Sequence, residues 1–218
     1  ELLKRHNIKP EDATIAIQGF GNVGSWTAKC AADKGLKIVA LSDISGGIYD
    51  ANGLDPYKVE EYAKAHDGLI KGYPGATAIS GDEVLLQDVD VLIPAALELQ
   101  ITEKNADKIK AKMIVEAANG PTDDKADVIL HKRGIEVVPD VLANGGGVTV
   151  SYFEWVQNIQ SVSWTEDEVN KKLREIMDAA FASVWDLAQE KHTTLRMGAY
   201  LIALKRVVDA KSARAIWP

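Results

Sequence analysis

From residue 14 to about residue 150, short apolar runs alternate with amphipathic stretches. The apolar runs are rich in β-branched residues and only a few residues long, which is typical of strands buried on both faces of a parallel sheet. They therefore predict the strands of one sheet. The predicted strands are residues 14–18, 37–42, 89–95, 113–118 and 135–139.

The stretches between these runs carry apolar residues at helical spacing and predict helices that cover the sheet. Gly35 and Gly134 directly follow two of them, and glycine in that position commonly ends a helix. Residues 72–80 contain two glycines and a proline, so we expect mostly loop there, with a short extra strand as the alternative. The predicted helices are residues 25–34, 56–65, 81–87, 102–109 and 123–133.

The pattern changes after residue 147, where runs of the strand type stop and helical spacing continues. Thr165 and Glu168 have the spacing of a capping box, which predicts that a helix starts there. Apolar residues then recur in steps of three and four from Val169 to Ala188, as on a helix that packs along one face. A last helix is predicted over residues 195–212.

Together these patterns predict a Rossmann-type α/β fold, in which a doubly wound, mostly parallel sheet is followed by C-terminal helices. We expect this sheet and the helices that cover it to form a core over residues 1–147. Residues 148–218 are expected to form a helical segment that packs on this core, so that the chain makes a single structural domain.

A glycine-rich segment, QGFGNVG at residues 18–24, lies where the first predicted strand turns into a helix. The G-x-G-x-x-G pattern is weak by itself, but Asp43 follows at the end of the second strand, where an acid accepts ribose hydroxyls. Gly19 is expected to permit the tight turn, Gly21 the approach of a pyrophosphate, and Gly24 close packing of helix on strand. The free N–H groups of the helix start would face the phosphates. The segment therefore predicts a dinucleotide site, and the core over residues 1–147 is expected to be a dinucleotide-binding core.

The carboxylate of Asp43 also favours NAD over NADP, because a negative charge beside the adenosine ribose repels a 2′-phosphate. NADP remains possible, since Lys58 would reach a phosphate if its loop folded back. The alternative for Asp43 is a turn residue before Gly46 and Gly47.

Composition and charge exclude several other classes of function. The chain has 218 residues, of which 46% are hydrophobic, and its net charge of −7 repels nucleic acid. Four scattered histidines lack metal-ligand spacing, so no metal site is expected, and the single cysteine forms no intrachain disulfide. We find neither a membrane span nor a secretion signal, and we expect a cytoplasmic protein without membrane partners.

Five motifs resemble the cofactor-binding domain of hexameric glutamate dehydrogenases, within the wider family of amino-acid dehydrogenases. They follow one another in family order and cover almost the whole chain. The last is the most specific, since its glycines, hydroxyls and aromatics would rarely recur together. The motifs are QGFGNVG (18–24), SDISGGIYDANGLD (42–55), PAALELQIT (94–102), VEAANGPT (115–122) and NGGGVTVSYFEWVQN (144–158).

The resemblance implies further cofactor contacts besides the three glycines. Asn119 and Asn144 each precede a glycine and could instead form turns. An amide side chain both donates and accepts hydrogen bonds, however, as recognition of the nicotinamide half requires. The implied contacts are Phe20 in the glycine loop, Asn22 and Val23 at the pyrophosphate, Asp43 and Ile44 at the adenosine ribose, Ala95 and Ala96 at the rim, Asn119 at the nicotinamide ribose, and Asn144 near the carboxamide.

Val148 and Ser151 resemble the family positions that line the substrate pocket. The Ser151 hydroxyl would bind the side-chain carboxylate of glutamate, whereas an apolar substrate would leave this hydroxyl unpaired. The resemblance therefore favours glutamate over leucine or phenylalanine. Alternatively, Thr149 and Ser151 cap a helix over residues 152–158.

In the family, an enzyme of this kind reversibly converts glutamate to 2-oxoglutarate and ammonia, using a lysine and an aspartate of a preceding substrate domain. Nothing in this sequence resembles that domain, so we assign no catalytic residue and expect no turnover by the chain alone. The alternatives are a stand-alone NAD-binding module, a domain of a related leucine or phenylalanine enzyme, or a methyltransferase of similar fold. Apolar C-terminal helices without their partner would favour self-association.

Overall fold

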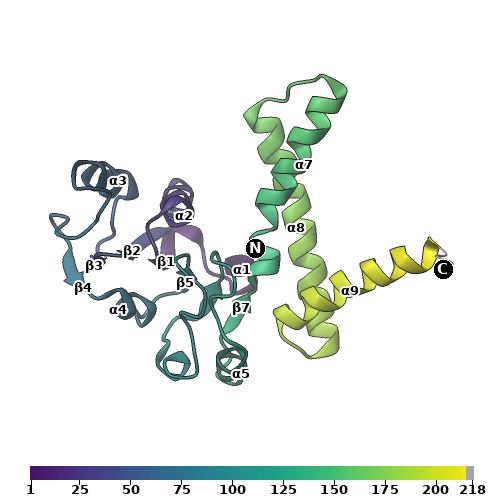
Figure 1. Cartoon of the computed structure of the whole chain (residues 1–218). Coiled ribbons are helices and arrows are strands. Elements are labelled where there is room, and N and C mark those ends of the chain that lie inside the picture. The colour runs from purple at the N-terminus through teal and green to yellow at the C-terminus, as the bar shows by residue number, and fades with distance from the viewer. Residues whose placement is uncertain (215–218) are drawn as a thin grey trace. The chain divides into compact units, whose positions relative to one another are not determined.

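The computed structural model describes residues 1–214 of the chain. They belong to two compact units, Glu1–Asp140 and Val141–Pro218, which we call the sheet unit and the helical unit (Figure 1). The expectation that both make a single domain, divided after residue 147, stays a prediction. None of the helices in residues 1–214 is long and apolar enough to cross a bilayer.

The sheet unit is built on seven strands in the order β4-β3-β2-β1-β5-β6-β7. The pairs from β2 through β1, β5 and β6 to β7 are parallel, and β3 pairs antiparallel with both β2 and β4. The predicted Rossmann-type, mostly parallel sheet is therefore confirmed. The strands are β1 Thr14–Gln18, β2 Lys37–Asp43, β3 Gly46–Tyr49, β4 Thr77–Ile79, β5 Val91–Pro94, β6 Met113–Val115 and β7 Glu136–Val138.

All five predicted strands are present, because each apolar run supplies side chains that are buried between two helical layers. The expected boundaries were too long for the last three. The short strand given as an alternative within residues 72–80 is confirmed as β4.

The sequence did not predict β3, because its two glycines lack side chains that would mark a strand. The chain leaves β2 at Asp43 and re-enters the sheet at Gly46, and so short a connection permits only antiparallel pairing. Gly46 has a φ of +134°, a backbone angle that residues with a side chain rarely adopt. The motif after Asp43 is therefore a hairpin and not a loop.

Helices cover both faces of the sheet, with α2 and α3 on one side and α4 and α5 on the other (Figure 1). On the second side, a core formed by residues such as Leu85, Leu92, Ile114 and Leu130 is shielded from solvent. Asp55 caps α3 by accepting from the N–H of Tyr57. The helices of this unit are α1 Leu2–Arg5, α2 Asn22–Asp33, α3 Pro56–Ala65, α4 Gly81–Leu85 and α5 Asp124–Lys132, with short 3-10 helices at Pro10–Asp12 (η1) and Ala106–Lys108 (η2).

The helix expected over residues 102–109 is wrong, since only η2 forms there. The Asn105 side chain accepts from the N–H of Thr102 at 2.8 Å and donates to the carbonyl of Gln100 at 2.9 Å. Such local side-chain bonds compete with helical ones. Arg133 then donates to the carbonyls of Ala106 and Ile109, which ends the turn.

The helical unit consists of long helices joined by tight turns. The capping box of Thr165 and Glu168 is confirmed at the start of α8, with both reciprocal hydrogen bonds present. Thr149 and Ser151 lie inside α7, so the alternative that they cap a helix is wrong. The helices are α6 Asp140–Ala143, which begins at the boundary of the two units, α7 Gly145–Gln160, α8 Glu166–Lys191 and α9 Leu195–Ala213.

Candidate functional site

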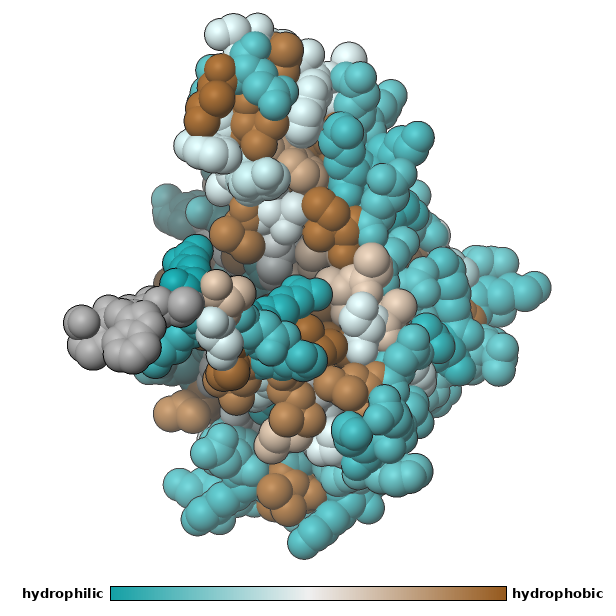
Figure 2. All heavy atoms as spheres, turned by 90° about the vertical axis from the view of Figure 1, so that its right-hand side faces the viewer, coloured by the Kyte–Doolittle hydropathy of each residue, from teal (hydrophilic) through white to brown (hydrophobic). Residues whose placement is uncertain are grey.

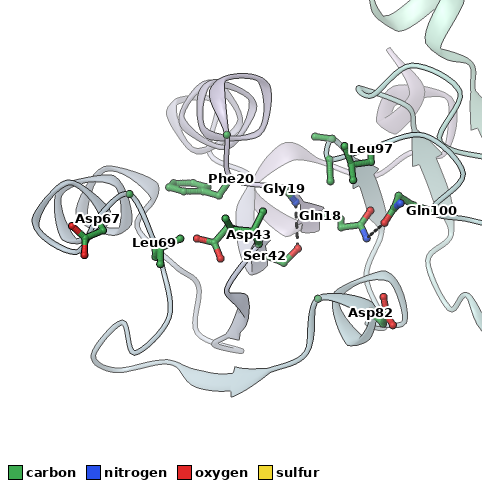
Figure 3. Close-up of a pocket in the computed structure, with 16 residues that line it drawn as sticks. Gln18, Gly19, Phe20, Ser42, Asp43, Asp67, Leu69, Asp82, Leu97 and Gln100 are labelled. Atoms are coloured by element: carbon green, nitrogen blue, oxygen red, sulfur yellow. Dashed lines mark hydrogen bonds between the residues drawn. The ribbon is translucent and has the colours of Figure 1, made fainter.

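A pocket of about 570 Å³ lies at the carboxyl ends of β1, β2 and β5 in the sheet unit (Figure 3). At this point the chain has left β1 toward β2 on one side and later returns to β5 on the other, and ligands of open α/β sheets bind at such a switch. The lining residues are Gln18, Gly19, Phe20, Gly21, Ser42, Asp43, Ile44, Asp67, Gly68, Leu69, Gly81, Asp82, Ala95, Ala96, Leu97 and Gln100.

Two glycines of the loop are required by the protein's own packing. Gly19 has a φ of +103°, and a Cβ there would lie 2.9 Å from the main chain of Ala95 and Ala96. A Cβ on Gly24 would lie 1.7 Å from the carbonyl oxygen of Gly19. The predicted tight turn at Gly19 and close packing at Gly24 are therefore confirmed.

Gly21 differs from the other two, because no close contact with another part of the protein requires glycine there, although glycine is a favoured residue at the N-cap position that it occupies. Its φ of −78° suits any residue, and a Cβ there would have no described atom within 4 Å. The N–H groups of Asn22, Val23 and Gly24 begin α2 beside it, and none has an acceptor within residues 1–214. Open space next to unpaired N–H groups at a helix start fits a bound phosphate group.

Asp43 ends β2 at the pocket, and both of its carboxylate oxygens already bind the protein. Oδ1 accepts from the N–H of Ser45 at 2.7 Å and from the Ser45 hydroxyl, and Oδ2 accepts from the N–H of Ile70 at 2.8 Å. A carboxylate offers about four lone-pair sites, so one remains for a ribose hydroxyl. The turn role given as an alternative and a place at the pocket are thus combined in one side chain.

The pocket is acidic at the end formed by β2, α3 and α4. Asp43, Asp67 and Asp82 line it, and none of the sixteen lining residues is lysine, arginine or histidine. Lys58, considered above as a phosphate partner, does not line the pocket. Its Nζ lies 3.8 Å from Oδ2 of Asp55. This end therefore repels a phosphate group and suits a ribose with free hydroxyls.

Seven of the predicted site residues line the pocket together. They come from the glycine loop, the end of β2 and the end of β5, which are far apart in the sequence. Asn22, Val23 and Gly24 follow directly as the first turn of α2. The seven are Gly19, Phe20, Gly21, Asp43, Ile44, Ala95 and Ala96.

The remaining predicted residues do not line this pocket. Asn119 is exposed in the loop after β6, within the sheet unit. Asn144 precedes α7 in the helical unit, and Val148 and Ser151 follow at steps of four and three, so that all three share one helix face. Their side chains are exposed on that face.

Several lining residues were missed in the sequence. Asp67 and Gly68 follow α3 with φ values of 55° and 80°, and the pair Asp-Gly after a helical stretch is a turn signal that could have located this loop. Gln18 donates to Gln100 at 2.9 Å, and its own Oε1 is buried without a donor in the part of the chain described. The missed residues are Gln18, Ser42, Asp67, Gly68, Leu69, Gly81, Asp82, Leu97 and Gln100.

The described residues do not form a candidate metal site. Within residues 1–214, no three histidine, cysteine, aspartate or glutamate side chains come close enough together to hold an ion. The start of α2 next to the pocket offers main-chain N–H groups for phosphate, and the pocket itself offers carboxylates for hydroxyls, which are the two functions that a dinucleotide needs.

Comparison with known proteins identifies the family. The model of the glutamate/leucine/phenylalanine/valine dehydrogenases matches residues 1–215. The chain belongs to this family. The resemblance found in the motifs is therefore confirmed, and the methyltransferase alternative is excluded.

Two curated dehydrogenases illustrate the similarity in sequence. The chain is 50% identical over 209 residues to the NADP-specific glutamate dehydrogenase A1 of Halobacterium salinarum, and 49% identical over 212 residues to the glutamate dehydrogenase of Thermotoga maritima. These alignments cover 95% and 97% of this chain, but 50% and 51% of the relatives. The chain thus spans about half the length of the curated dehydrogenases it matches.

Solved dehydrogenase structures share the fold. The hetero-hexameric glutamate dehydrogenase of Thermus thermophilus, in its Leu-bound form, superposes with a TM-score of 0.91 at 32% identity, covering 100% of this chain and 51% of that one. The glutamate dehydrogenase of Peptoniphilus asaccharolyticus gives a TM-score of 0.84 at 39% identity, covering 99% and 50%.

Proposed function

We propose that the chain is the cofactor-binding part of an NAD-dependent glutamate dehydrogenase, which oxidatively deaminates L-glutamate to 2-oxoglutarate and ammonia. The observation that carries this proposal is the empty space beside Gly21, next to the unpaired N–H groups of α2. When bound, the oxidised nicotinamide supplies the acceptor for a hydride from the α-carbon of glutamate.

In this proposal, different residues of the chain bind different parts of the cofactor. The N–H groups of Asn22 and Val23 bind the pyrophosphate, while Gly19 and Gly21 leave room for it. Asp43 accepts a ribose hydroxyl with its remaining lone pair, and Phe20, Gly24, Ile44, Ala95 and Ala96 shape the path of the cofactor. Asn119 and Asn144 bind the ribose and carboxamide of the nicotinamide half.

The proposal favours NAD over NADP. Asp43, Asp67 and Asp82 line the adenosine end without a nearby cation in the pocket wall, and a 2′-phosphate would add negative charge there. The relative from Halobacterium salinarum is described as NADP-specific, so the preference of this chain depends on its own lining residues.

Glutamate is the substrate that the exposed face of α7 favours. Ser151 offers a hydroxyl to a side-chain carboxylate, and Val148 adds an apolar contact one turn earlier. An apolar substrate would leave this hydroxyl unpaired in a closed site, which is unfavourable. Leucine or phenylalanine is therefore the second candidate substrate class.

The chain by itself should bind NAD without turnover, because it carries cofactor residues and no assigned catalytic lysine or aspartate. A calorimetric titration with NAD tests binding, and absorbance of NADH in the presence of glutamate tests turnover. We expect heat of binding and no NADH signal. NADH formation by the pure chain, or no binding of NAD, would contradict the proposal.

A stand-alone NAD-binding module would give the same result in those two measurements. Adding the separately produced substrate half of a homologous dehydrogenase distinguishes the two functions. Restored glutamate-dependent NADH formation supports an enzyme fragment. Continued absence of turnover, with the two halves shown to associate, would favour the module.

We also propose that the chain self-associates through α9. Apolar residues recur along this helix in steps of three and four, and brown side chains interrupt the hydrophilic surface in Figure 2. A stripe of this kind marks an interaction surface. Sedimentation equilibrium should give a mass above the 23.6 kDa of one chain, and a monomer at high concentration would contradict it. The exposed residues are Met197, Tyr200, Leu201, Leu204, Val207 and Val208.

A further inference from the structure

One wall of the pocket is a loop that follows α3, residues 66–73, which we call the wall loop. Asp67, Gly68 and Leu69 line the pocket from this loop (Figure 3). Asp67 and Gly68 both have left-handed backbone conformations, with φ values of 55° and 80°. The shape of the wall loop therefore depends on the contacts that hold it in place.

The first of these contacts is Asp43. Ile70 is fully buried, and its N–H donates to Oδ2 of Asp43 at 2.8 Å. The carboxylate that we propose as the ribose acceptor thus also holds the wall loop against the end of β2. The position of the loop and the orientation of this carboxylate are coupled.

The second contact is Tyr62, which belongs to α3 and does not line the pocket. Its hydroxyl donates to the carbonyl of Lys71 at 3.0 Å, one residue beyond Ile70. Its ring stacks on His66, with centroids 3.8 Å apart and planes 16° apart, and lies nearly perpendicular to the ring of Tyr73, with centroids 5.5 Å apart. Tyr62 therefore contacts the wall loop at its beginning and near its end.

Gly72 makes room for this arrangement. A Cβ on Gly72 would lie 3.1 Å from the hydroxyl oxygen of Tyr62, and its φ of +82° is one that side chains rarely adopt. The backbone next to Lys71 is thus shaped so that the Tyr62 hydroxyl reaches the carbonyl.

We propose that Tyr62 is a positioning residue for the adenosine half of the cofactor. By fixing the carbonyl of Lys71, it keeps the N–H of Ile70 on Asp43 and keeps Asp67 to Leu69 in the pocket wall. Without this bond the loop samples more conformations, and binding must then order it. The inference rests on the proposed function, because it assumes that a dinucleotide occupies the pocket.

The test compares Tyr62→Phe with Tyr73→Phe in the full chain. Both variants lose one phenolic hydroxyl, but that of Tyr73 makes no hydrogen bond within residues 1–214. NMR titrations would use NAD, ADP-ribose, which contains the adenosine half, and nicotinamide mononucleotide, which lacks it. We expect Tyr62→Phe to weaken NAD and ADP-ribose by about 3-fold to 10-fold, the value of one hydrogen bond, and to leave the mononucleotide unchanged.

Hydrogen exchange of the Ile70 N–H gives a measurement on the free protein. It should be faster in Tyr62→Phe, while exchange in the strands β1 and β2 stays at the wild-type rate. Tyr73→Phe should match wild type in every measurement. A purely structural role of Tyr62 would instead accelerate exchange throughout the sheet.

Two outcomes would overturn the inference. One is unchanged ADP-ribose affinity in Tyr62→Phe, and the other is an equal loss for ADP-ribose and the mononucleotide. Failure of the wild-type chain to bind NAD and ADP-ribose would overturn the proposed function itself. This failure is distinguishable from failure of the inference, because it is measured on the wild-type chain before any residue is substituted.

Discussion

The ammonium group of Lys29 on α2 lies 2.8 Å from Oε1 of Glu60 on α3, although only 7% of the Lys29 side chain is exposed. Lys29 also lies over the ring of Trp26, 3.8 Å from its centroid. The other oxygen of Glu60 accepts from Lys64 at 2.9 Å. Hydrogen bonds from these two lysines lower the pKa of Glu60 from 4.5 to about 2.

This ion pair predicts a pH-dependent stability. Glu60→Gln leaves the buried ammonium without its anion and should lower the urea midpoint at pH 7. Because the pKa of Glu60 is depressed in the folded state, its contribution is complete above pH 4.5 and is lost as the pH falls toward about 2. The difference between variant and wild type should therefore shrink over that range.

Glu61→Gln is the matched control, because Glu61 is exposed on the same helix and forms no ion pair in the part of the chain described. Urea unfolding followed by circular dichroism measures all three proteins. A Glu60→Gln effect that stays constant from pH 7 to pH 3 would contradict this account.

The glycine loop predicts opposite results for two substitutions. Gly21→Ala meets no protein atom within 4 Å, so the free energy of unfolding should fall by no more than about 1 kcal/mol, the cost of alanine at an N-cap. NAD affinity should fall at least about 10-fold, because the methyl group takes the space of the pyrophosphate. Thermal unfolding and calorimetric titration measure the two effects separately.

Gly24→Ala places its methyl group 1.7 Å from the carbonyl oxygen of Gly19, and backbone must move to accommodate it. It should destabilise the fold by more than about 2 kcal/mol. If Gly21→Ala were the more destabilising of the two, the open space beside Gly21 would have another explanation.

The acidic lining predicts how cofactor preference can be changed. Asp67→Asn with Asp82→Asn removes two charges from the pocket, and neither side chain makes a hydrogen bond or ion pair within residues 1–214 that would be lost. NADP affinity should rise by about 3-fold to 10-fold at low salt, with little change for NAD, and the effect should shrink as salt is added.

Asp12→Asn with Asp88→Asn changes the net charge equally, and neither residue lines the pocket. This control should leave both affinities unchanged. Asp43→Ala is a poorer test, because it also releases the N–H groups of Ser45 and Ile70. A rise in NADP affinity with the control pair would mean that the overall charge of the chain, and not the acidic residues that line the pocket, determines the cofactor preference.

Arg133 predicts a stability effect away from the pocket. It donates 2.5 Å and 2.6 Å bonds to the carbonyls of Ala106 and Ile109, both buried residues. Arg133→Ala should cost about 1–2 kcal/mol, since charge-assisted hydrogen bonds to two carbonyls are lost. Lys132→Ala, which changes the neighbouring exposed cation, should stay within about 0.5 kcal/mol in the same urea unfolding experiment.

The parts of the fold that depend on local pattern were predictable from the sequence. β1 follows from the apolar run TIAIQ, and α3 from residues 56–65, where Asp55 and Pro56 start a helix. The start of α2 was predicted at residue 25, whereas the helix begins three residues earlier, at Asn22.

The parts that depend on contacts between distant segments were not predictable. β3 owes its place to pairing with β2, and its glycines carry no pattern of their own. The glycine loop and Asp43 were located by spacing, whereas Asp67 and Asp82 reach the pocket only through the packing of α3 and α4. The hydrogen bond from Ile70 to Asp43 joins two segments that no short-range pattern connects.

The contact between Gly19 and the main chain of Ala95 has a consequence for folding. The two residues directly follow β1 and β5, and these paired strands are separated in the sequence by β2, β3, β4 and the helices α2, α3 and α4. This backbone arrangement at Gly19 therefore does not exist in a chain that is ordered only locally, and a ligand that binds there binds the finished fold. Such a ligand stabilises the finished fold by mass action and slows its unfolding, while the rate of refolding stays that of the bare chain.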